Sequence, residues 1–346
     1  MKKLRVLLLI LCLACASAAL PVQAAGSATP AASVAKGGKW VKTGSGKKYR
    51  LKGGAYAQNQ WLKIGGKYYY FLKSGLMAKN RMITTDGKTY YVKANGVRIK
   101  SSWIKKNGKS YYFDKNGVRA QKKWIRRSGK LYYVGADGAI AKNQWVDGGK
   151  YYVGADGLKL KNCVKNGYYL NADGKKVVKV FKGDYIFVGD SRMVGMQKAI
   201  APADTLYIAK VGEGYSWLKS TAGVKLKYYL KANPNVKVVL ALGVNDLGNV
   251  KSYISYYKKL IKNFPKTKFY ILSVNPVDDA KVAKRGYKVK NSAINSFNKK
   301  MYVAFRSRYV NTYKEMKADG FGSRDGLHYL EADYIKLYRS IVEKIQ

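Results

Sequence analysis

An aromatic residue returns at a fixed interval through the first half of the chain. The nodes of this 21-residue grid are Trp40, Trp61, Trp103, Trp124 and Trp145, with Met82 at the vacant node. A period of this length is typical of short structural units that repeat along a chain. Because one such unit is too small to bury its own apolar face, the units have to stack on one another to form a core.

Each unit continues with a turn and a pair of tyrosines. Asn107-Gly108 precedes Tyr111-Tyr112, and Ser128-Gly129 precedes Tyr132-Tyr133. Glycine turns of the Asn-Gly kind between aromatic runs predict β-hairpins. We therefore expect a β-hairpin solenoid over residues 39–180, in which the Trp and Tyr rings of neighbouring units close the core.

At these residues the array resembles the choline-binding and glucan-binding repeats of Gram-positive surface proteins, over roughly Lys39 to Val178. The resemblance implies attachment to wall polymers through aromatic side chains. The candidate wall-binding residues are Trp40, Trp61, Trp103, Trp124, Trp145, Tyr111, Tyr112, Tyr132 and Tyr133. The alternative is that these aromatic residues only form the core of the solenoid.

The array departs from the usual choline-binding pattern just before the tyrosine pair, where such units carry a second aromatic residue. Here the slot holds Tyr68, Thr89, Ser110 or Leu131. Residues 31–180 also contain 34 Lys or Arg against six Asp. Both features favour an anionic wall polymer, such as teichoic acid, peptidoglycan or a glucan, over a small quaternary ammonium ligand.

The first residues predict export to the cell surface. Met1 to Arg5 is basic, the following run is mostly apolar, and Val22-Gln23-Ala24 offers a cleavage site. We expect a signal peptide over residues 1–24 and a linker over residues 25–38, with no transmembrane segment after signal removal.

Two cysteines lie inside the predicted signal peptide. Lipidation of Cys15 is disfavoured because the residues before it lack the leucine usual at such sites. Signal removal leaves Cys163 alone, so the exported chain forms no internal disulfide, and we expect Cys163 to be a small packed residue.

The charge of the chain points to a polyanionic partner. The formal net charge is +48, and +45 remains once Lys2, Lys3 and Arg5 leave with the signal peptide. Nucleic acid is a common partner of so basic a protein, whereas an exported protein meets wall polymers. No recognised nucleic-acid-binding motif appears, so we expect the wall polymer.

After Lys182 the repeats end, and apolar runs alternate with helical patterns. This alternation predicts a parallel sheet with helices on both faces, a doubly wound α/β/α sandwich over residues 181–346. The expected strands lie near residues 185–188, 206–211, 236–242 and 268–274. The expected helices lie near residues 193–200, 217–231, 253–263, 292–305 and 331–344.

Polar residues follow two of these strands, at the sheet edge where ligands bind in such folds. Gly189-Asp190-Ser191-Arg192 places Ser191 at the start of a helix, where N–H groups favour negative charge. Met193 stands where the nucleophile elbow of α/β-hydrolases requires glycine, which disfavours that superfamily. Gly243-Val244-Asn245-Asp246 offers the Asn245 amide as a donor to an oxyanion.

The segment Asp325-Gly326-Leu327-His328 contains the only histidine of the chain. Imidazole is the side chain suited to act as a general base near neutral pH. The spacing lets Asp325 accept a hydrogen bond from the imidazole Nδ1–H, which leaves Nε2 to deprotonate Ser191. Taken singly, the blocks also fit an N-cap serine or ordinary turns and loops.

In this order the blocks resemble the SGNH hydrolases, also called GDSL-like esterases, over about Lys182 to Gln346. The resemblance implies a flavodoxin-like fold and an acyl-enzyme mechanism without metal or organic cofactor, with Ser191, His328 and Asp325 as the catalytic residues. It also implies an oxyanion hole made by the Ser191 N–H, Asn245 and a glycine N–H, for which Gly214 fits best and Gly212 second.

Arg192 departs from the leucine or isoleucine common after the catalytic serine of that family. We expect it to place a cation beside an anionic or sugar-rich substrate, with Gly212 and Asp246 also near the substrate. For a wall-bound domain of this kind, we expect an esterase that removes O-acetyl groups from peptidoglycan or wall polysaccharide. An O-acyltransferase acting on wall glycans, and a non-catalytic wall-binding or adhesive protein, are the alternatives.

Overall fold

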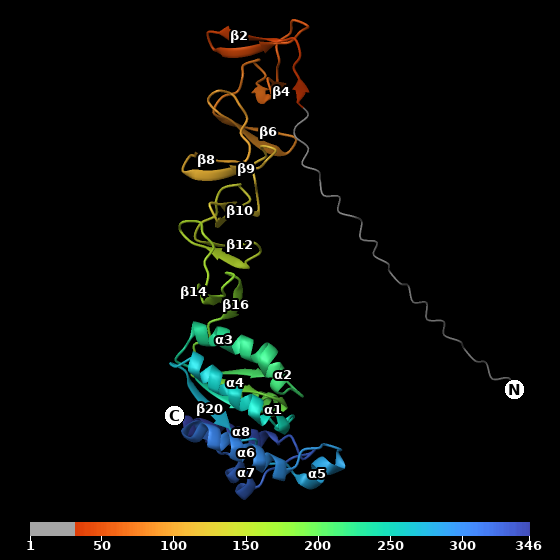
Figure 1. Cartoon of the computed structure of the whole chain (residues 1–346), viewed down its shortest axis with the longest axis vertical. Helices are drawn as coiled ribbons and strands as arrows, with labels where there is room; N and C mark the ends of the chain where they lie inside the picture. Colours follow the sequence, from red (N-terminus) through yellow and green to blue (C-terminus); the bar gives the residue numbers. More distant parts are fainter. Residues whose placement is uncertain (1–31) are drawn as a thin grey trace, which may run out of the picture. The chain divides into compact units, whose positions relative to one another are not determined.

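The computed structural model describes residues 32–346, and these residues form two compact units (Figure 1). The first unit contains residues 32–125 and 134–140, and the second contains residues 126–133 and 141–346. The signal peptide predicted at residues 1–24, with Cys15, lies outside the described residues. No helix within residues 32–346 is both long and apolar enough to cross a membrane.

The predicted array of antiparallel hairpins is confirmed. In the first unit the pairs are β2 (Lys39–Thr43) with β3 (Gly46–Arg50), β4 (Gln60–Ile64) with β5 (Lys67–Phe71), β6 (Arg81–Thr85) with β7 (Lys88–Val92), and β8 (Ser102–Lys106) with β9 (Lys109–Phe113). In the second unit they are β12 (Gln144–Val146) with β13 (Tyr151–Val153), and β15 (Tyr168–Leu170) with both β14 (Cys163–Lys165) and β16 (Lys176–Lys179). A further two-stranded sheet consists of β10 (Lys123–Arg127) and β11 (Lys130–Val134).

The register explains the period of the repeats. Five of the periodic residues lie directly opposite a tyrosine of the returning strand: Trp40, Trp61, Met82, Trp103 and Trp145. Asn107 and Gly108 both have positive φ, 49° and 73°, which the tight hairpin turn requires. The turn residues and the aromatic spacing therefore fix the same register.

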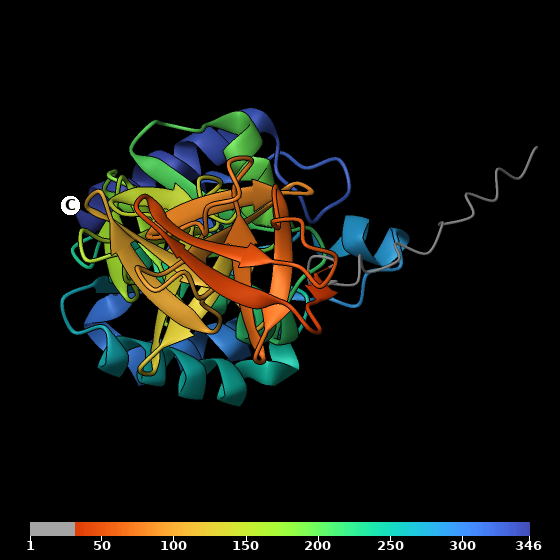
Figure 2. The ribbon, with the colours of Figure 1, turned by 90° about the horizontal axis from the view of Figure 1, so that it is seen from above.

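Successive hairpins of the first unit are joined by backbone hydrogen bonds. Arg98 N donates to Tyr68 O at 2.9 Å, and one repeat later Arg119 N donates to Thr89 O at 2.7 Å. Figure 2 shows that successive hairpins are rotated relative to one another. Rings between them, such as those of Tyr90 and Phe113, are buried, so each hairpin depends on its neighbours.

One strand was not expected. β1 (Ser33–Val34) pairs in parallel with β4, and its partners are Leu62 and Lys63. The segment predicted as a linker over residues 25–38 therefore includes a strand of the first unit. Two residues are too few to produce a recognisable alternation in the sequence.

The predicted parallel sheet is also confirmed. It contains β17 (Tyr185–Gly189), β18 (Thr205–Ala209), β19 (Lys237–Ala241), β20 (Lys268–Leu272) and the unpredicted β21 (Tyr309–Val310), in the order β18-β17-β19-β20-β21. The first strand along the chain thus lies between the second and third, which creates a crevice at the carboxyl ends of β17 and β19.

Four predicted helices appear with slightly shifted ends: α1 (Ser191–Ala199), α4 (Val250–Asn263), α6 (Asn291–Phe305) and α8 (Glu331–Ile345). The helix predicted at residues 217–231 is instead α2 (Tyr215–Trp217), a π-helical turn (Leu218–Ala222) and α3 (Gly223–Ala232). The short helices α5 (Asp279–Lys284) and α7 (Tyr313–Asp319) were not predicted.

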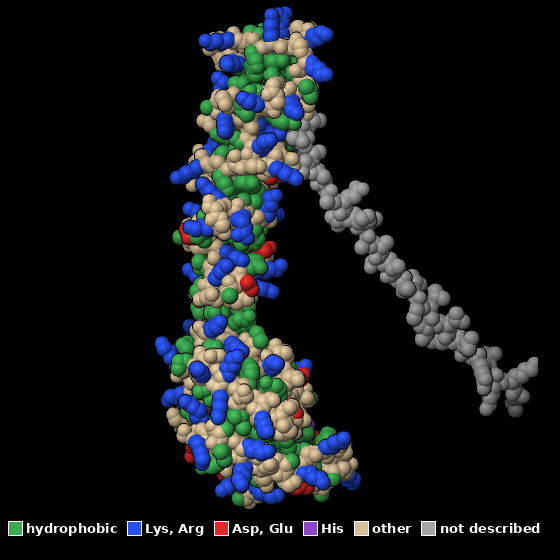
Figure 3. Space-filling model, viewed as in Figure 1, with side chains coloured by type: hydrophobic (Ala, Val, Ile, Leu, Met, Phe, Trp, Pro, Cys, Tyr) green, Lys and Arg blue, Asp and Glu red, His purple; other side chains and the backbone are tan. Residues whose placement is uncertain are grey.

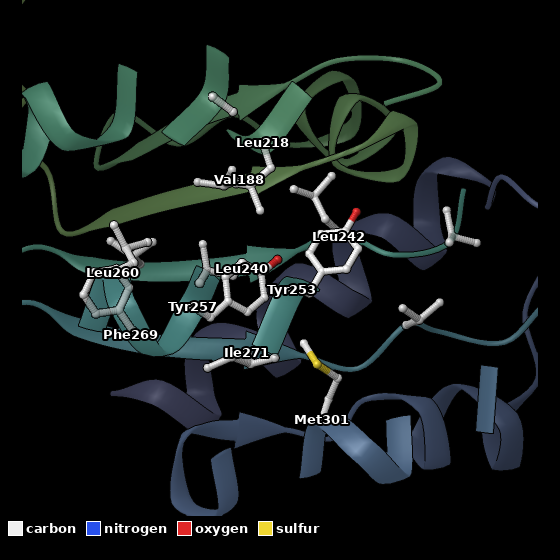
Figure 4. Close-up of a cluster of buried hydrophobic side chains, with 14 of the residues drawn as sticks. Val188, Leu218, Leu240, Leu242, Tyr253, Tyr257, Leu260, Phe269, Ile271 and Met301 are labelled. Carbon is white, nitrogen blue, oxygen red and sulfur yellow. The ribbon is translucent and has the colours of Figure 1, made fainter. Parts of the chain in front are cut away.

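Helices cover both faces of the sheet. Val188 of β17 packs in a cluster with Tyr257 of α4 and Met301 of α6, as Figure 4 shows. Phe187, the residue before it, faces the opposite cluster, which includes Ile341 of α8. Because neighbouring strand residues point to opposite faces, a strand that is apolar throughout requires a covering layer on each side.

Candidate functional site

The candidate site begins where β17 ends. Asp190 caps α1, because its Oδ1 accepts a hydrogen bond of 3.0 Å from Arg192 N. Ser191 is therefore not the cap, and its hydroxyl is free for another partner. Its Oγ lies 2.8 Å from His328 Nε2.

His328 lies in the loop between α7 and α8, where Asp325 orients it. Asp325 Oδ2 is 2.6 Å from His328 Nδ1, and Asp325 Oδ1 accepts hydrogen bonds from Leu327 N at 2.9 Å and His328 N at 2.8 Å. Burial raises the pKa of Asp325, but the hydrogen bonds from His328 and Leu327 outweigh it and leave the pKa at about 2. An ionised Asp325 holds the proton on Nδ1, so Nε2 presents its lone pair to Ser191.

Ser323 also holds this loop, a role that was not predicted from the sequence. Its hydroxyl donates to His328 O at 2.6 Å and accepts from Gly326 N at 2.8 Å. Gly326 has φ +83°, and a Cβ there would lie 2.7 Å from Val282 N, so the turn requires glycine. A serine two residues before an aspartate is a turn signal, which could have indicated this role.

The loops after β18 and β19 meet beside the serine and contain the predicted oxyanion donors. Asn245 Nδ2 donates to Glu213 O at 2.8 Å, and Tyr215 N donates to Asp246 Oδ2 at 2.8 Å. A Cβ at Gly214 would lie 2.4 Å from Asp246 Oδ2, so the two loops are in close contact. Among the described residues, the N–H groups of Ser191 and Gly214 have no acceptor.

The structure corrects the expectation for Arg192. Its side chain is only 5% exposed, and the guanidinium donates to Leu327 O at 3.1 Å, Asn275 O at 2.7 Å and Pro276 O at 3.3 Å. It also lies over the ring of Tyr329. Arg192 therefore holds two loops together and does not present a cation to a substrate.

Asp246 holds loops together, and its predicted place near a substrate stays a prediction. Its Oδ1 accepts a hydrogen bond of 2.7 Å from Tyr253 Oη, and Oδ2 accepts from Tyr215 N and from Asn249 Nδ2 at 3.0 Å. Both oxygens are thus used to hold the loops. Gly212 has φ +74° with open space where a Cβ would stand, so its role near a substrate stays a prediction.

Asp190 is buried directly behind the serine. Burial raises the pKa of Asp190 to about 6, against the opposing effects of the Arg192 charge and the hydrogen bond from Arg192 N. The sequence block contained this residue, but nothing in it indicated complete burial.

A hollow of about 450 Å³ opens beside the Ser191–His328 pair. It lies between α1, α8 and the loop after β18. Its lining residues are Ser191, Val194, Gly195, Lys198, Ala199, Val211, His328, Tyr329, Glu331 and Tyr334. Apart from Ser191 and His328, these lining residues were not predicted from the sequence, because α8 is distant from α1 in the chain.

The predicted wall-binding aromatic residues are divided between core and surface. Trp61 is 4% exposed and Trp40 is 38% exposed. The others are half-buried: Trp103, Trp124, Trp145, Tyr111, Tyr112, Tyr132 and Tyr133. Figure 3 shows Lys and Arg side chains spread over the face that it presents, with few acidic ones among them. Cys163 is a half-buried free thiol.

Stacked aromatic hairpins, and a parallel sheet with a hydrogen-bonded Ser-His-Asp group at its carboxyl edge, define a modular protein. Family models of choline-binding repeats match residues 57–103, 119–159 and 139–176, and a putative cell wall binding repeat matches residues 101–118. Residues 57–176 therefore contain choline-binding repeats of the cell-wall-binding kind.

Similar solved structures include three from Streptococcus pneumoniae. Choline binding protein F is 28% identical over 40% of this chain and 47% of that chain, with a TM-score of 0.34. The choline-binding domain of CbpL is 29% identical over 41% and 87%, with a TM-score of 0.28. The modular autolysin LytC, in complex with a synthetic peptidoglycan ligand, is 19% identical over 79% and 71%, with a TM-score of 0.36.

The chain spans about half the length of the first of these structures. A search of curated proteins found no match. Among the described residues, no group of three or more His, Cys, Asp or Glu side chains is arranged to hold a metal ion.

Proposed function

We propose that the chain is a secreted, wall-associated serine esterase of the SGNH type. The observation that carries this proposal is the pair of hydrogen bonds that His328 makes. Its Nε2 lies 2.8 Å from Ser191 Oγ, and its Nδ1 lies 2.6 Å from Asp325 Oδ2. The order of the three residues and the strand order of the sheet support the same family. The repeats support attachment to the wall.

In the first step, Ser191 Oγ attacks the carbonyl carbon of an ester while its proton passes to His328 Nε2. The resulting oxyanion is held by the N–H groups of Ser191 and Gly214 and by the Asn245 amide. Collapse of this intermediate breaks the bond to the alcohol, which takes the proton from Nε2. The products of this step are the free alcohol and an acyl group on Ser191.

In the second step, a water molecule gives a proton to Nε2 and attacks the acyl carbonyl carbon. The bond to Ser191 Oγ then breaks, Oγ recovers the proton from Nε2, and the carboxylic acid leaves. Asp325 stays ionised throughout because its pKa is about 2. Its charge stabilises the imidazolium that forms in each step.

The proposed substrate is an O-acetyl ester of peptidoglycan or of a wall polysaccharide. Two observations support it: the chain contains cell-wall-binding repeats, and the hollow of about 450 Å³ beside Ser191 is open to solvent. The basic repeats are proposed to bind an anionic wall polymer, since residues 31–180 carry 34 Lys or Arg against six Asp.

The test is acetate release from O-acetylated wall by the purified full chain. The Ser191→Ala variant is expected to lower the rate by at least about a thousandfold, because the nucleophile is lost. Ser220→Ala removes a surface hydroxyl and serves as the matched control with an unchanged rate. Equal release by the unchanged chain and Ser191→Ala would end the proposed mechanism.

A fluorophosphonate probe tests the nucleophile itself, independently of the choice of substrate. The probe is expected to label Ser191 in the unchanged chain and not in Ser191→Ala. An unlabelled Ser191 would favour the alternative of a non-catalytic wall-binding protein. Transfer of acetyl to an added glycan, without free acetate, would favour an O-acyltransferase.

A further inference from the structure

A group of aromatic rings in the first unit encloses a cation that belongs to the chain itself. The Arg98 guanidinium lies over the rings of Trp61, Tyr68 and Tyr90, with its carbon 5.5, 4.0 and 5.4 Å from their centroids. These separations are within the range of cation–π attraction. Arg98 is 9% exposed, and its Nη1 has no hydrogen-bond partner among the described residues. The aromatic faces are therefore the main partners of this charge.

The backbone places Arg98 in this aromatic cage. Arg98 N donates to Tyr68 O at 2.9 Å, which fixes the residue against the preceding hairpin. From the following repeat, Gly117 packs close to the side chain: a Cβ there would lie 3.0 Å from Arg98 Nε. The guanidinium is thus held from both sides along the stack.

A cation also lies over an aromatic ring in the next repeat. Arg119 follows Arg98 by one full period, and its guanidinium carbon lies 5.9 Å from the centroid of the Tyr111 ring. Its Nη1 is 3.7 Å from the sulfur of Met82, the residue that replaces tryptophan at this node. Arg119 N also donates to the preceding hairpin, at Thr89 O.

A lysine has the same place in the second unit. Lys176 Nζ lies 4.9 Å from the centroid of the Trp145 ring and 4.8 Å from that of Tyr168. Its backbone N donates to Lys150 O at 2.8 Å, again in the preceding hairpin. Three repeats thus carry an internal cation at the residue that links one hairpin to the previous one.

The first repeat provides the contrast within the same chain. Met77 precedes Arg98 by one full period and makes the same backbone link, with its N donating to Lys47 O at 2.8 Å. The neighbouring rings of Trp40 and Tyr69 have centroids 5.1 Å apart, and Trp40 is 38% exposed. Among the described residues, no Lys or Arg lies over either ring.

We propose that Arg98 and Lys176 are built-in occupants that close their aromatic cages to choline and to other quaternary ammonium ligands. Such a ligand needs the same ring faces that the internal cation already covers. Arg119 covers the Tyr111 ring of its own repeat in the same way. Of these four repeats, only the one with Trp40, Tyr69 and Met77 stays open. The array then holds the wall through its exposed lysines and arginines, an inference that rests on the wall attachment proposed above.

The test opens a closed cage and measures choline binding directly. All variants carry Trp40→Ala, which removes the open cage of the first repeat. Arg98→Met is added to this chain, because methionine already fits at the equivalent position one repeat earlier, where Met77 lies. Choline chloride is titrated against the full chain at constant ionic strength, and tryptophan fluorescence is followed. We expect no saturation with Arg98 present, and at least tenfold tighter, saturable binding with Arg98→Met.

Three controls accompany this measurement. Arg98→Lys keeps a cation in the cage and should stay closed. Addition of Trp61→Ala to the Arg98→Met chain should abolish the new binding, which assigns it to this cage. Circular dichroism checks that each variant is folded; if Arg98→Met does not fold, Lys176→Met makes the same test at Trp145 in the second unit.

Two results would overturn the inference. One is saturable choline binding by the Trp40→Ala chain with Arg98 intact, lost on Trp61→Ala. The other is no gain of binding by folded Arg98→Met or Lys176→Met chains. Acetate release and wall retention without choline are measured on the same preparations, and their failure would contradict the proposed function independently of the choline result.

Discussion

A single arginine next to the nucleophile organises the candidate site without facing its hollow. Arg192 joins the loop after β20 to the loop that carries His328, through three backbone carbonyl groups. The planar guanidinium can reach all three, whereas an ammonium group is a compact point charge. The position of the imidazole therefore depends on Arg192 as well as on Asp325.

The Arg192→Lys variant should lower both stability and activity. Loss of donors leaves buried carbonyl groups unsatisfied, which costs about 1–3 kcal/mol for each group, so we expect the free energy of unfolding to fall by about 3 kcal/mol. Urea unfolding and hydrolysis of p-nitrophenyl acetate measure the two effects. Arg324→Lys, at an exposed position, is the control; equal effects of both substitutions would contradict the assigned role.

Asp190 gives the fold a specific dependence on pH. Its pKa is about 6 in the folded chain and about 3.9 in an unfolded one. The folded state therefore binds more protons between about pH 4 and pH 6, and the free energy of unfolding decreases as the pH rises through this window. The contribution is up to about 3 kcal/mol, at roughly 1.4 kcal/mol per pKa unit.

Asp190→Asn should remove this part of the pH dependence while keeping the cap of α1, because an asparagine oxygen also accepts from Arg192 N. Urea unfolding of both chains at pH 4.5 and pH 7.5 measures the difference. Carboxylates common to both chains cancel in the comparison. The prediction fails if the two chains lose the same free energy of unfolding between these pH values.

At the residue scale, sequence reasoning succeeded where chain order carries the information. Ser191, Asp325 and His328 were predicted to meet, and they do. Arg192 was predicted wrongly, because the direction of its side chain is set by carbonyl groups that are distant in the chain. The sequence contains Arg192 and the residues of these carbonyl groups, but it does not show that they lie close together in the fold.

At the scale of elements, the contact between two loops positions the proposed oxyanion donors. The loop after β18 and the loop after β19 meet at Gly214 and Asp246. Gly214→Ala should therefore displace the Gly214 N–H and lower kcat by about a hundredfold, the usual effect of losing one such donor. Hydrolysis of p-nitrophenyl acetate measures it.

Gly248→Ala is the matched control for this loop contact. Gly248 lies in the same loop after β19, has open space for a Cβ and does not have a positive φ. It should keep kcat within about twofold, because nothing has to move. Equal kcat values for the Gly214→Ala and Gly248→Ala chains would rule out the proposed donor.

Longer helices and strands were predicted from the sequence, and very short ones were missed. The four longer strands of the sheet were found because their apolar runs face covering layers on both sides. β21 and β1 have two residues each, and α5 has six, which is too short for a periodic signal. The π-helical turn at residues 218–222 was also missed, since an apolar periodicity does not distinguish one π-helical turn from α-helix.

For the whole molecule, charge governs the proposed wall attachment. The net charge of +48 acts over the Debye length, which falls from about 10 Å at 0.1 M salt to about 3 Å at 1 M. Retention on isolated walls should therefore decrease steeply as sodium chloride is raised over this range. The Ser191→Ala chain is used so that the wall is not modified during the measurement.

The lysines of the repeats should carry most of this attraction. Lys79 and Lys100 are exposed, one repeat apart, in the first unit, whereas Lys258 and Lys259 are exposed on α4. The Lys79→Gln/Lys100→Gln chain should bind the wall at least about threefold more weakly. Its affinity should also depend less on salt, because two attractive contacts between lysine and the anionic polymer, both screened by salt, are lost. Lys258→Gln/Lys259→Gln lowers the net charge equally, so equal losses from both pairs would show that the wall responds to total charge and not to the repeat surface.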